Sequence, residues 1–250
     1  MEPRFVSPTA SIAGSGPCGQ TLLTPSVTTV AGSGEDLYRD GFGITAALQD
    51  PRGLTLLNGR IYFLDAQAAT LRRFDPLKGE VVTLAGSPGQ FGGDDGTGAA
   101  ARFVSPRHMT SDGSGRLFIV DTKGAKIRVY DVASGEVNTL AGDGTPGCAD
   151  GPGASAKVHR PRGIAFDGAS IYWGEFNRHT IRQLGLAGDT VSTLAGRHCA
   201  GVSVPPCPGG FADGVGTQAQ FSGPLDLVWH ATSGSFFVFD SGNAVLRRVR

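Results

Sequence analysis

Short apolar runs separated by turn residues fill most of the chain. In one stretch, β-rich runs cover residues 108–112, 117–121 and 126–131, and the segments Asp-Gly-Ser-Gly and Thr-Lys-Gly-Ala separate them. Short runs rich in β-branched and aromatic residues, bounded by Gly and Asp, are typical of strands joined by tight turns. No segment shows the spacing of an amphipathic helix. The pattern therefore predicts an all-β fold.

This strand pattern occurs in repeats. The motif Val-x-Thr-Leu/Val-Ala-Gly covers positions 27–32, 81–86, 137–142 and 191–196, so it returns at a nearly constant period. A second motif, Asp-Gly-x-Gly followed by Ala, an apolar residue and Pro, begins at Asp40, Asp95, Asp150 and Asp213 and ends at Pro51, Pro106, Pro161 and Pro224. The interval from Asp to Pro is thus identical in every copy. A linker would not keep so constant a length, so each loop is predicted to pack against a sheet.

Four short strands per repeat at this period indicate a β-propeller. The string that runs from Thr-Leu-Ala-Gly through Asp-Gly-x-Gly to Pro-Arg-Gly-Ile-Ala and Asn-x-His-Thr-Ile-Arg resembles the NHL-repeat family of β-propellers, most closely at residues 177–182. The resemblance covers residues 27–250. Propellers similar to this family include protein-binding modules, RNA-binding modules and a few secreted enzymes, so the resemblance implies the fold and leaves the function open.

We expect an all-β propeller of four blades, each with four antiparallel strands, in which the N-terminal strand closes the last blade. The last repeat supplies three strands, ending with residues 245–249, whereas residues 27–31 carry a fourth-strand motif. Pairing of these two segments would close the ring and remove an open sheet edge. Residues 4–8 repeat residues 102–106 letter for letter. Residues 1–26 are therefore predicted to be an N-terminal extension or a degenerate repeat remnant, residues 27–250 the propeller, and membership of a larger chain or assembly stays open.

Charge and composition exclude several classes of protein. The 22 basic and 22 acidic side chains give a net charge of zero, which argues against nucleic-acid binding. No apolar stretch approaches the ~20 residues that a membrane helix needs. The 39 glycines fit a turn-dense fold.

The loop of the fourth repeat carries an insertion with two cysteines. The stretch from Gly196 to Pro224 is longer than the corresponding stretch of any other repeat, and its extra length contains Cys199 and Cys207. A disulfide between them is predicted, and with it an extracellular or other oxidising compartment. No signal peptide is visible, which leaves a cytoplasmic location open. Pairing of Cys18 with Cys148 stays open too. The alternatives to the disulfide are two free thiols and a zinc site, for which His198 is the only hint.

The first candidate ligand-binding residues are three arginines. Arg52, Arg107 and Arg162 follow the loop prolines, where the inner strand of each blade starts, and are expected to gather on one face of the propeller, here called the top face. Three guanidinium groups around one mouth would suit a carboxylate, a phosphate or an acidic side chain. The alternative is that each arginine pairs with the acid that ends the second strand of its blade, as part of blade packing.

Further candidates break the repeat. His108 and Asp226 replace the Gly that follows Arg in other repeats, and Trp173 and Glu175 replace an aliphatic residue and Asp. The Asp-Gly-x-Gly loops each offer one reliable carboxylate, too few for calcium. No motif for a nucleophile or a nucleotide is present, so no catalytic residue, metal or cofactor is predicted.

We interpret the chain as a non-catalytic recognition or scaffold domain that binds a protein or a small anionic ligand on its top face. The first alternative is a secreted metal-dependent lyase or lactonase, which related propellers include. The second is an RNA-binding module, whose basic patch would consist of Arg60, Arg72, Arg73, Arg247, Arg248 and Arg250.

Overall fold

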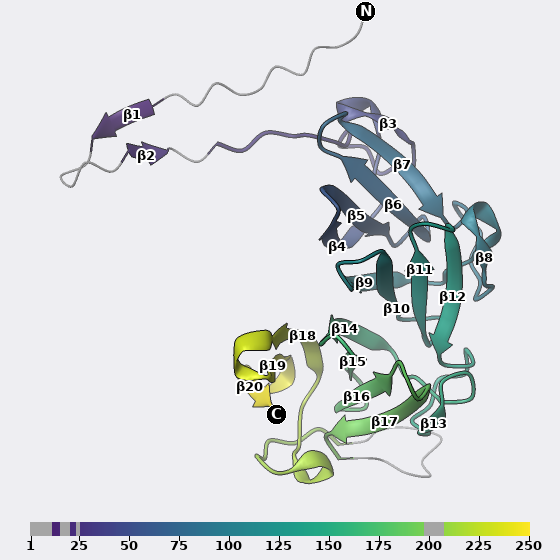
Figure 1. The fold of residues 1–250 in the computed structure, drawn as a ribbon, viewed down its shortest axis with the longest axis vertical. Helices are drawn as coiled ribbons and strands as arrows, with labels where there is room; N and C mark the ends of the chain where they lie inside the picture. Colours follow the sequence, from purple (N-terminus) through teal and green to yellow (C-terminus); the bar gives the residue numbers. More distant parts are fainter. Residues whose placement is uncertain (1–11, 16–20, 24–25, 198–207) are drawn as a thin grey trace, which may run out of the picture.

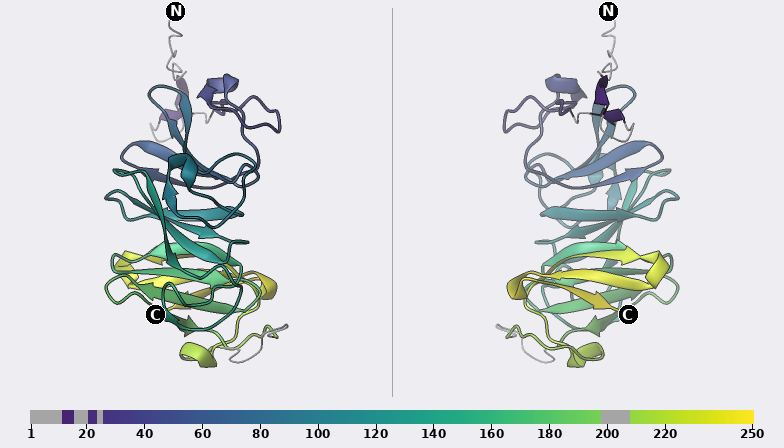
Figure 2. Two further views of the ribbon diagram at one scale, coloured as in Figure 1. Left: turned by 90° about the vertical axis from the view of Figure 1, so that its right-hand side faces the viewer. Right: turned by 90° about the vertical axis from the view of Figure 1, so that its left-hand side faces the viewer.

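Four antiparallel sheets follow one another as the blades of a propeller in the computed structural model, which describes residues 12–15, 21–23, 26–197 and 208–250. Figure 1 shows the blades as an arc, and Figure 2 shows from the side that neighbouring sheets lie in layers. The predictions of an all-β fold and of four propeller blades are confirmed.

Each blade is a meander that starts on the inside of the arc. Blade 1 consists of β4 (Pro51–Leu57), β5 (Arg60–Asp65), β6 (Thr70–Asp75) and β7 (Glu80–Ala85). Blade 2 consists of β9 (Pro106–Ser111), β10 (Arg116–Asp121), β11 (Lys126–Asp131) and β12 (Glu136–Ala141). Blade 3 consists of β14 (Pro161–Phe166), β15 (Ser170–Glu175), β16 (Thr180–Gly185) and β17 (Thr190–Ala195). Blade 4 consists of β18 (Pro224–His230), β19 (Ser235–Asp240) and β20 (Val245–Val249).

Short elements decorate the blades. The two-residue strands β3 (Gly41–Phe42), β8 (Gly96–Thr97) and β13 (Gly151–Pro152) pair with β7, β12 and β17. Single 3₁₀ turns are η1 (Gly43–Thr45), η2 (Gly98–Ala100), η3 (Gly216–Gln218), η4 (Ala231–Ser233) and η5 (Ser241–Asn243). A hairpin of β1 (Ile12–Ser15) and β2 (Thr21–Leu23) stands apart from the blades (Figure 1).

The strands of an internal blade contain continuous apolar runs, because a neighbouring blade covers each face of its sheet. In β10 the four successive side chains from Leu117 to Val120 are fully buried. Leu117 and Ile119 pack toward blade 1, whereas Phe118 and Val120 pack toward blade 3. A sheet with one solvated face would instead alternate apolar and polar residues.

Each Asp-Gly-x-Gly loop packs on its blade, as predicted. Its Ala is at most 5% exposed in all four copies, at Ala46, Ala101, Ala156 and Ala219. In blade 1 the loop aspartate, Asp40, accepts hydrogen bonds from the backbone N–H and the hydroxyl of Thr83 in the outer strand. Asp95 and Asp150 bind Thr139 and Thr193 in the same way.

A buried arginine from the third strand ties each loop to the sheet. The Arg72 guanidinium donates to the Asp65 carboxylate at 3.0 Å, to the Asp40 carboxylate at 2.9 Å and to two backbone carbonyls of the loop. Arg128, Arg182 and Arg247 hold equivalent places, and we call these four the interior arginines. Because every positive charge here faces a carboxylate and carbonyls, its burial is compensated.

The prediction that the N-terminal strand closes the last blade is wrong. The sheet of blade 4 contains β18, β19 and β20 only, and residues 26–31 belong to no strand. These residues leave blade 1 at one end of the arc, while β20 lies at the other end (Figure 1). The reason is the packing of the inner strands: β4, β9, β14 and β18 contact one another in sequence order, which fixes the turn from blade to blade, and three such steps leave the arc open.

Candidate functional site

Three arginines lie at the starts of the inner strands, on the top face. Arg52, Arg107 and Arg162 are each the second residue of β4, β9 and β14, because the preceding Pro opens the strand in every blade. Arg107 and Arg162 are partly buried, whereas Arg52 is exposed and pairs with Asp50 at 2.8 Å. We call these three the rim arginines.

The alternative pairing of the rim arginines with the acids of the second strands does not form. Asp65 and Glu175 bind the interior arginines Arg72 and Arg182, at 3.0 and 3.1 Å. Asp121 accepts hydrogen bonds from the backbone N–H groups of residues 104 and 105, at 2.9 and 2.7 Å. Across the described part of the chain, no carboxylate lies within ion-pair distance of Arg107 or Arg162.

Two further arginines and a histidine from blade 3 extend this group. Burial lowers the pKa of Arg162, and the charges of Arg107, Arg160 and Arg52 lower it further. Burial likewise lowers the pKa of His159, with contributions from Arg178 and Arg160. These shifts trace one connected field of positive charge. We call Arg52, Arg107, Arg160, Arg162 and Arg178 the arginine cluster.

Part of the arginine cluster is buried in the blades. Arg178, in the turn between β15 and β16, is 6% exposed, and its Nε has no hydrogen-bond partner among the described residues. The same holds for the buried Nε atoms of Arg107 and Arg162, and also for those of the interior arginines Arg72, Arg128 and Arg182. The Arg162 guanidinium lies 5.6 Å from the centre of the Phe176 ring, which favours a cation.

The arginine cluster ends at blade 4, which has no rim arginine. Its inner strand carries Leu225 where the other blades carry the rim arginine, followed by Asp226. The Asp226 carboxylate lies 3.7 Å from Nδ1 of His108, and both side chains are about two-fifths exposed, at 41% and 42%. A Cβ on Gly163 would meet Asp226 at 2.3 Å, so the two neighbouring inner strands approach closely at this point. Two predicted candidates, His108 and Asp226, thus lie together beside Arg107 and Arg162.

The other two predicted candidates lie inside blade 3. Trp173 and Glu175 are both fully buried, and the Trp173 Nε1–H points at the Glu175 carboxylate, 3.4 Å away. The same carboxylate accepts from Arg182 and from the backbone N–H of His159. This places Trp173 and Glu175 in the support of the site, because Glu175 fixes the backbone beside Arg160, and away from the surface that a ligand reaches.

Several predictions meet no test here. Cys18, Cys199 and Cys207 lie outside the described residues, so the disulfide and the oxidising compartment inferred from it stay predictions. Among the described residues no three His, Cys, Asp or Glu side chains gather closely enough to hold a metal ion, and no helix has the length and apolarity to cross a membrane.

The basic patch expected for RNA binding does not assemble. Arg72 and Arg247 are buried and paired inside their blades, and Arg60 binds Asp75. Burial of two members removes the continuous positive surface that a nucleic acid would need.

Arg160, Arg178 and His159 were missed from the sequence, although they break the repeat. The positions equivalent to Arg160 hold Asp50, Ser105 and Gly223, and those equivalent to Arg178 hold Ala68, Gly124 and Asn243. A comparison of the residues before each Pro and of the turns after each second strand would have revealed both. Their convergence with the rim arginines needed the turn of the blades, which the repeat alone does not show.

Comparisons with known proteins find relatives that match part of the chain. No family model matches the chain. It is 38% identical over 107 residues to Protein SUPPRESSOR OF QUENCHING 1, chloroplastic, of Arabidopsis thaliana, a match over 41% of this chain and 10% of that protein. It is 29% identical over 179 residues to NHL repeat-containing protein 2 of Bos taurus, over 66% of this chain and 25% of that protein. The chain thus spans a quarter or less of these curated relatives.

Solved structures show the same fold. An auxiliary nutrient binding protein of Bacteroides ovatus superposes with a TM-score of 0.62 at 22% identity, over 82% of this chain and 49% of that one. The repeat motifs, the relatives that carry NHL repeats and the superposed structure agree with the four antiparallel blades. The resemblance drawn from the motifs is confirmed: the chain is a four-blade β-propeller that is similar to proteins carrying NHL repeats.

Proposed function

We propose that this propeller is a non-catalytic recognition domain that binds an anionic ligand on the arginine cluster. The ligand is either an acidic protein segment or a small polycarboxylate or phosphate compound. The observation that carries the proposal is the contrast between two sets of arginines. The terminal nitrogens of the interior arginines bind carboxylates and carbonyls, whereas no carboxylate in the described residues lies within ion-pair distance of Arg107 or Arg162.

Charge repulsion within the cluster supports an anion as the ligand. Burial and the neighbouring cations lower the pKa of Arg162 and of His159, so the nearby positive charges raise the free energy of the protonated forms of these two side chains. A bound anion reverses this repulsion and forms charge-assisted hydrogen bonds with the guanidinium groups. Arginine forks bind carboxylate and phosphate groups in a bidentate way, and both groups therefore fit the site.

The fold of the solved neighbours is compatible with this role. Two of them are described as auxiliary nutrient binding proteins, which is a property of those proteins and at 22% and 24% identity transfers the fold alone. The proposal for this chain therefore depends on its own arginines.

Fluorescence anisotropy of a labelled hexaglutamate peptide tests the proposal, with competition by citrate and by inorganic phosphate. We expect saturable binding that weakens as salt rises, and at least tenfold weaker binding by the double variant Arg107→Ala/Arg162→Ala. Arg248→Ala is the matched control, because Arg248 is an exposed arginine at the edge of blade 4. Equal loss in the control, or binding that the double variant retains, would count against the cluster.

A further inference from the structure

The three contacts between neighbouring blades are formed by equivalent residues. The blade that comes first contributes side chains from its second and third strands, such as Tyr62, Leu64 and Leu71 of blade 1. The blade that follows contributes its loop, inner strand and second strand, such as Met109 and Ile119 of blade 2. Equivalent residues form the contacts between blades 2 and 3 and between blades 3 and 4.

Blade 4 exposes to solvent the side chains that in blades 1 to 3 contact the following blade. Phe239 and Leu246 occupy the positions of Leu64 and Leu71, which are fully buried, yet both are 58% exposed. With Val228, Trp229 and Phe237 they line an apolar groove of about 430 Å³. Large apolar side chains gathered on one face typically mark an interaction surface.

Blade 1 exposes to solvent the side chains that in blades 2 to 4 contact the preceding blade. Leu54 takes the inner-strand position of Met109, Ile164 and Leu227, which are at most 6% exposed, but Leu54 itself is 71% exposed. Leu56, further along the same strand, is 65% exposed. One chain thus carries both halves of an interface that it already forms three times internally.

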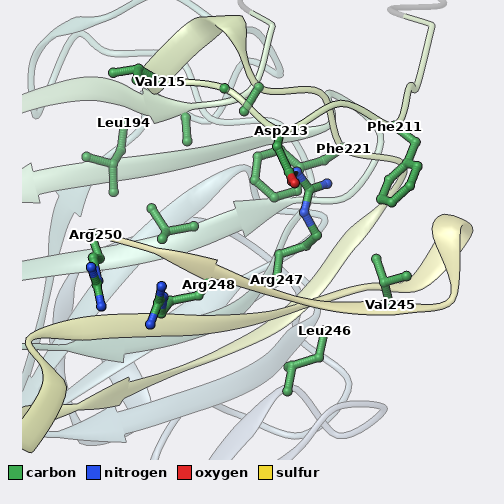
Figure 3. Close-up of a pocket in the computed structure, with 15 residues that line it drawn as sticks. Leu194, Phe211, Asp213, Val215, Phe221, Val245, Leu246, Arg247, Arg248 and Arg250 are labelled. Atoms are coloured by element: carbon green, nitrogen blue, oxygen red, sulfur yellow. Dashed lines mark hydrogen bonds and ion pairs between the residues drawn. The ribbon is translucent and has the colours of Figure 1, made fainter.

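Blade 4 also lacks the partner of its loop aspartate. In blades 1 to 3 that aspartate binds a Thr of the outer strand and is 41–44% exposed, whereas Asp213 binds only Arg247 among the described residues and is 94% exposed. A groove of about 650 Å³ lies along β20. In Figure 3, Asp213 and Arg247 lie close together in this groove, and Phe211, Phe221 and Val215 are among the residues that line it.

The sequence that would fill this groove is present in the chain. Thr29 stands in the motif where Thr83, Thr139 and Thr193 bind the loop aspartates, and residues 26–30 are exposed and outside any strand. The N–H of Gly32 donates to the Gly43 carbonyl just as Gly86 donates to Gly98. Residues 26–31 therefore leave blade 1 in the direction that the outer strand of a preceding blade would take.

We propose that copies of this chain associate head to tail, with blade 4 of one copy packed on blade 1 of the next and residues 27–31 of that next copy added to β20 as the fourth strand of blade 4. The register of the other blades places Thr29 opposite Arg247, beside Asp213. Strand addition satisfies the open edge of β20, and the apolar faces of the two blades bury one another. Because the two surfaces differ, the interface is heterologous and builds a ring or an open array.

Light scattering after size exclusion tests this proposal, starting from the 25.8 kDa monomer mass. We expect concentration-dependent multiples of that mass for the wild type. Phe239→Asp and Leu54→Asp should each weaken association at least tenfold, and an equimolar mixture of the two variants should form dimers only, since one intact tail remains for one intact head. Leu77→Asp is the control, because Leu77 is 91% exposed in the turn between β6 and β7 and lines neither groove of blade 4.

Cross-linking defines the strand that completes blade 4. Thr28→Cys in one chain and Arg248→Cys in another should form a disulfide between copies, since the equivalent residues Val82 and Arg73 face each other in blade 1. A strictly monomeric wild type overturns the proposal, as does a doubly substituted chain that links residues 28 and 248 within one copy. Association lost in Phe239→Asp but kept in Leu54→Asp would show a symmetric contact of blade 4 instead, and would also overturn it.

Discussion

Interior and rim arginines both recur along the repeat, yet their surroundings are opposite. The interior arginines are at most 9% exposed, and each reaches loop carbonyls and a carboxylate with its terminal nitrogens. Arg107 and Arg162 stand at the strand starts, near one another, and no carboxylate of the described chain lies within ion-pair distance of them. The interior set has its anions built into the fold, whereas the rim set leaves room for an anion from outside.

Removal of an interior arginine should have the largest effect on stability. Arg72→Met leaves the buried Asp65 carboxylate without its ion-pair partner at 3.0 Å and the loop carbonyls of blade 1 without their donor. We expect a loss of about 3–5 kcal/mol in the free energy of unfolding, the range found when one partner of a buried charge pair is removed. Urea unfolding measures it, with Arg107→Met as the matched rim variant. Equal losses in both variants would erase the distinction between the two sets.

The loop aspartates should show an intermediate effect that differs between blades. Asp150→Ala removes hydrogen bonds to Arg182 at 2.7 Å and to the N–H of Thr193 at 3.1 Å, so we expect a loss of about 1–2 kcal/mol, moderated by solvent screening of a side chain that is 42% exposed. Asp213→Ala should cost less in the monomer, because the Thr partner is missing there. Unfolding at protein concentrations that keep the chain monomeric tests the order of the two values.

Removal of two rim arginines should leave stability nearly unchanged. Arg107→Ala/Arg162→Ala deletes charges that repel one another, so we expect a free energy of unfolding within about 1 kcal/mol of the wild type, together with the loss of anion binding. Thermal melts measured alongside the anisotropy titration separate the two effects. A large fall in melting temperature would assign these arginines to blade packing.

The smallest expected effect is on the titration of His159. Burial, Arg178 and Arg160 lower its pKa in the folded chain, so between that value and about 6.5 the unfolded chain binds more protons. Stability should therefore fall slightly as the pH drops through this window, and His159→Gln should remove that slope. Citrate should raise the pKa of His159 in the wild type by supplying negative charge, and NMR titration of the imidazole measures this shift.

The repeat determined more of the fold than of the site. The constant interval from Asp to Pro predicts four equivalent packed loops, because only a fixed conformation keeps that length. The positions of Arg107 and Arg162 follow from the same register. Trp173 and Glu175 break the repeat as a functional residue would, yet they are buried, because a change of core volume in one blade breaks the repeat equally well.

Closure could not be predicted from local pattern. Residues 27–31 carry the right motif for a fourth strand, and the motif fixes the register but not the chain that supplies it. The turn from one blade to the next depends on how whole side chains such as Phe103 and Trp173 fill the space between sheets. That packing accumulates over four blades and leaves the arc open (Figure 1).

NMR of the arginine Nε–H groups during titration with citrate tests the central contrast most directly, since it observes both sets of arginines in one sample. We expect the signals of Arg107 and Arg162 to shift together and to saturate with one binding constant. The signals of Arg72, Arg128 and Arg182 should stay in place. Rim signals that do not respond, or equal shifts in both sets, would contradict the assignment of the arginine cluster as the anion site.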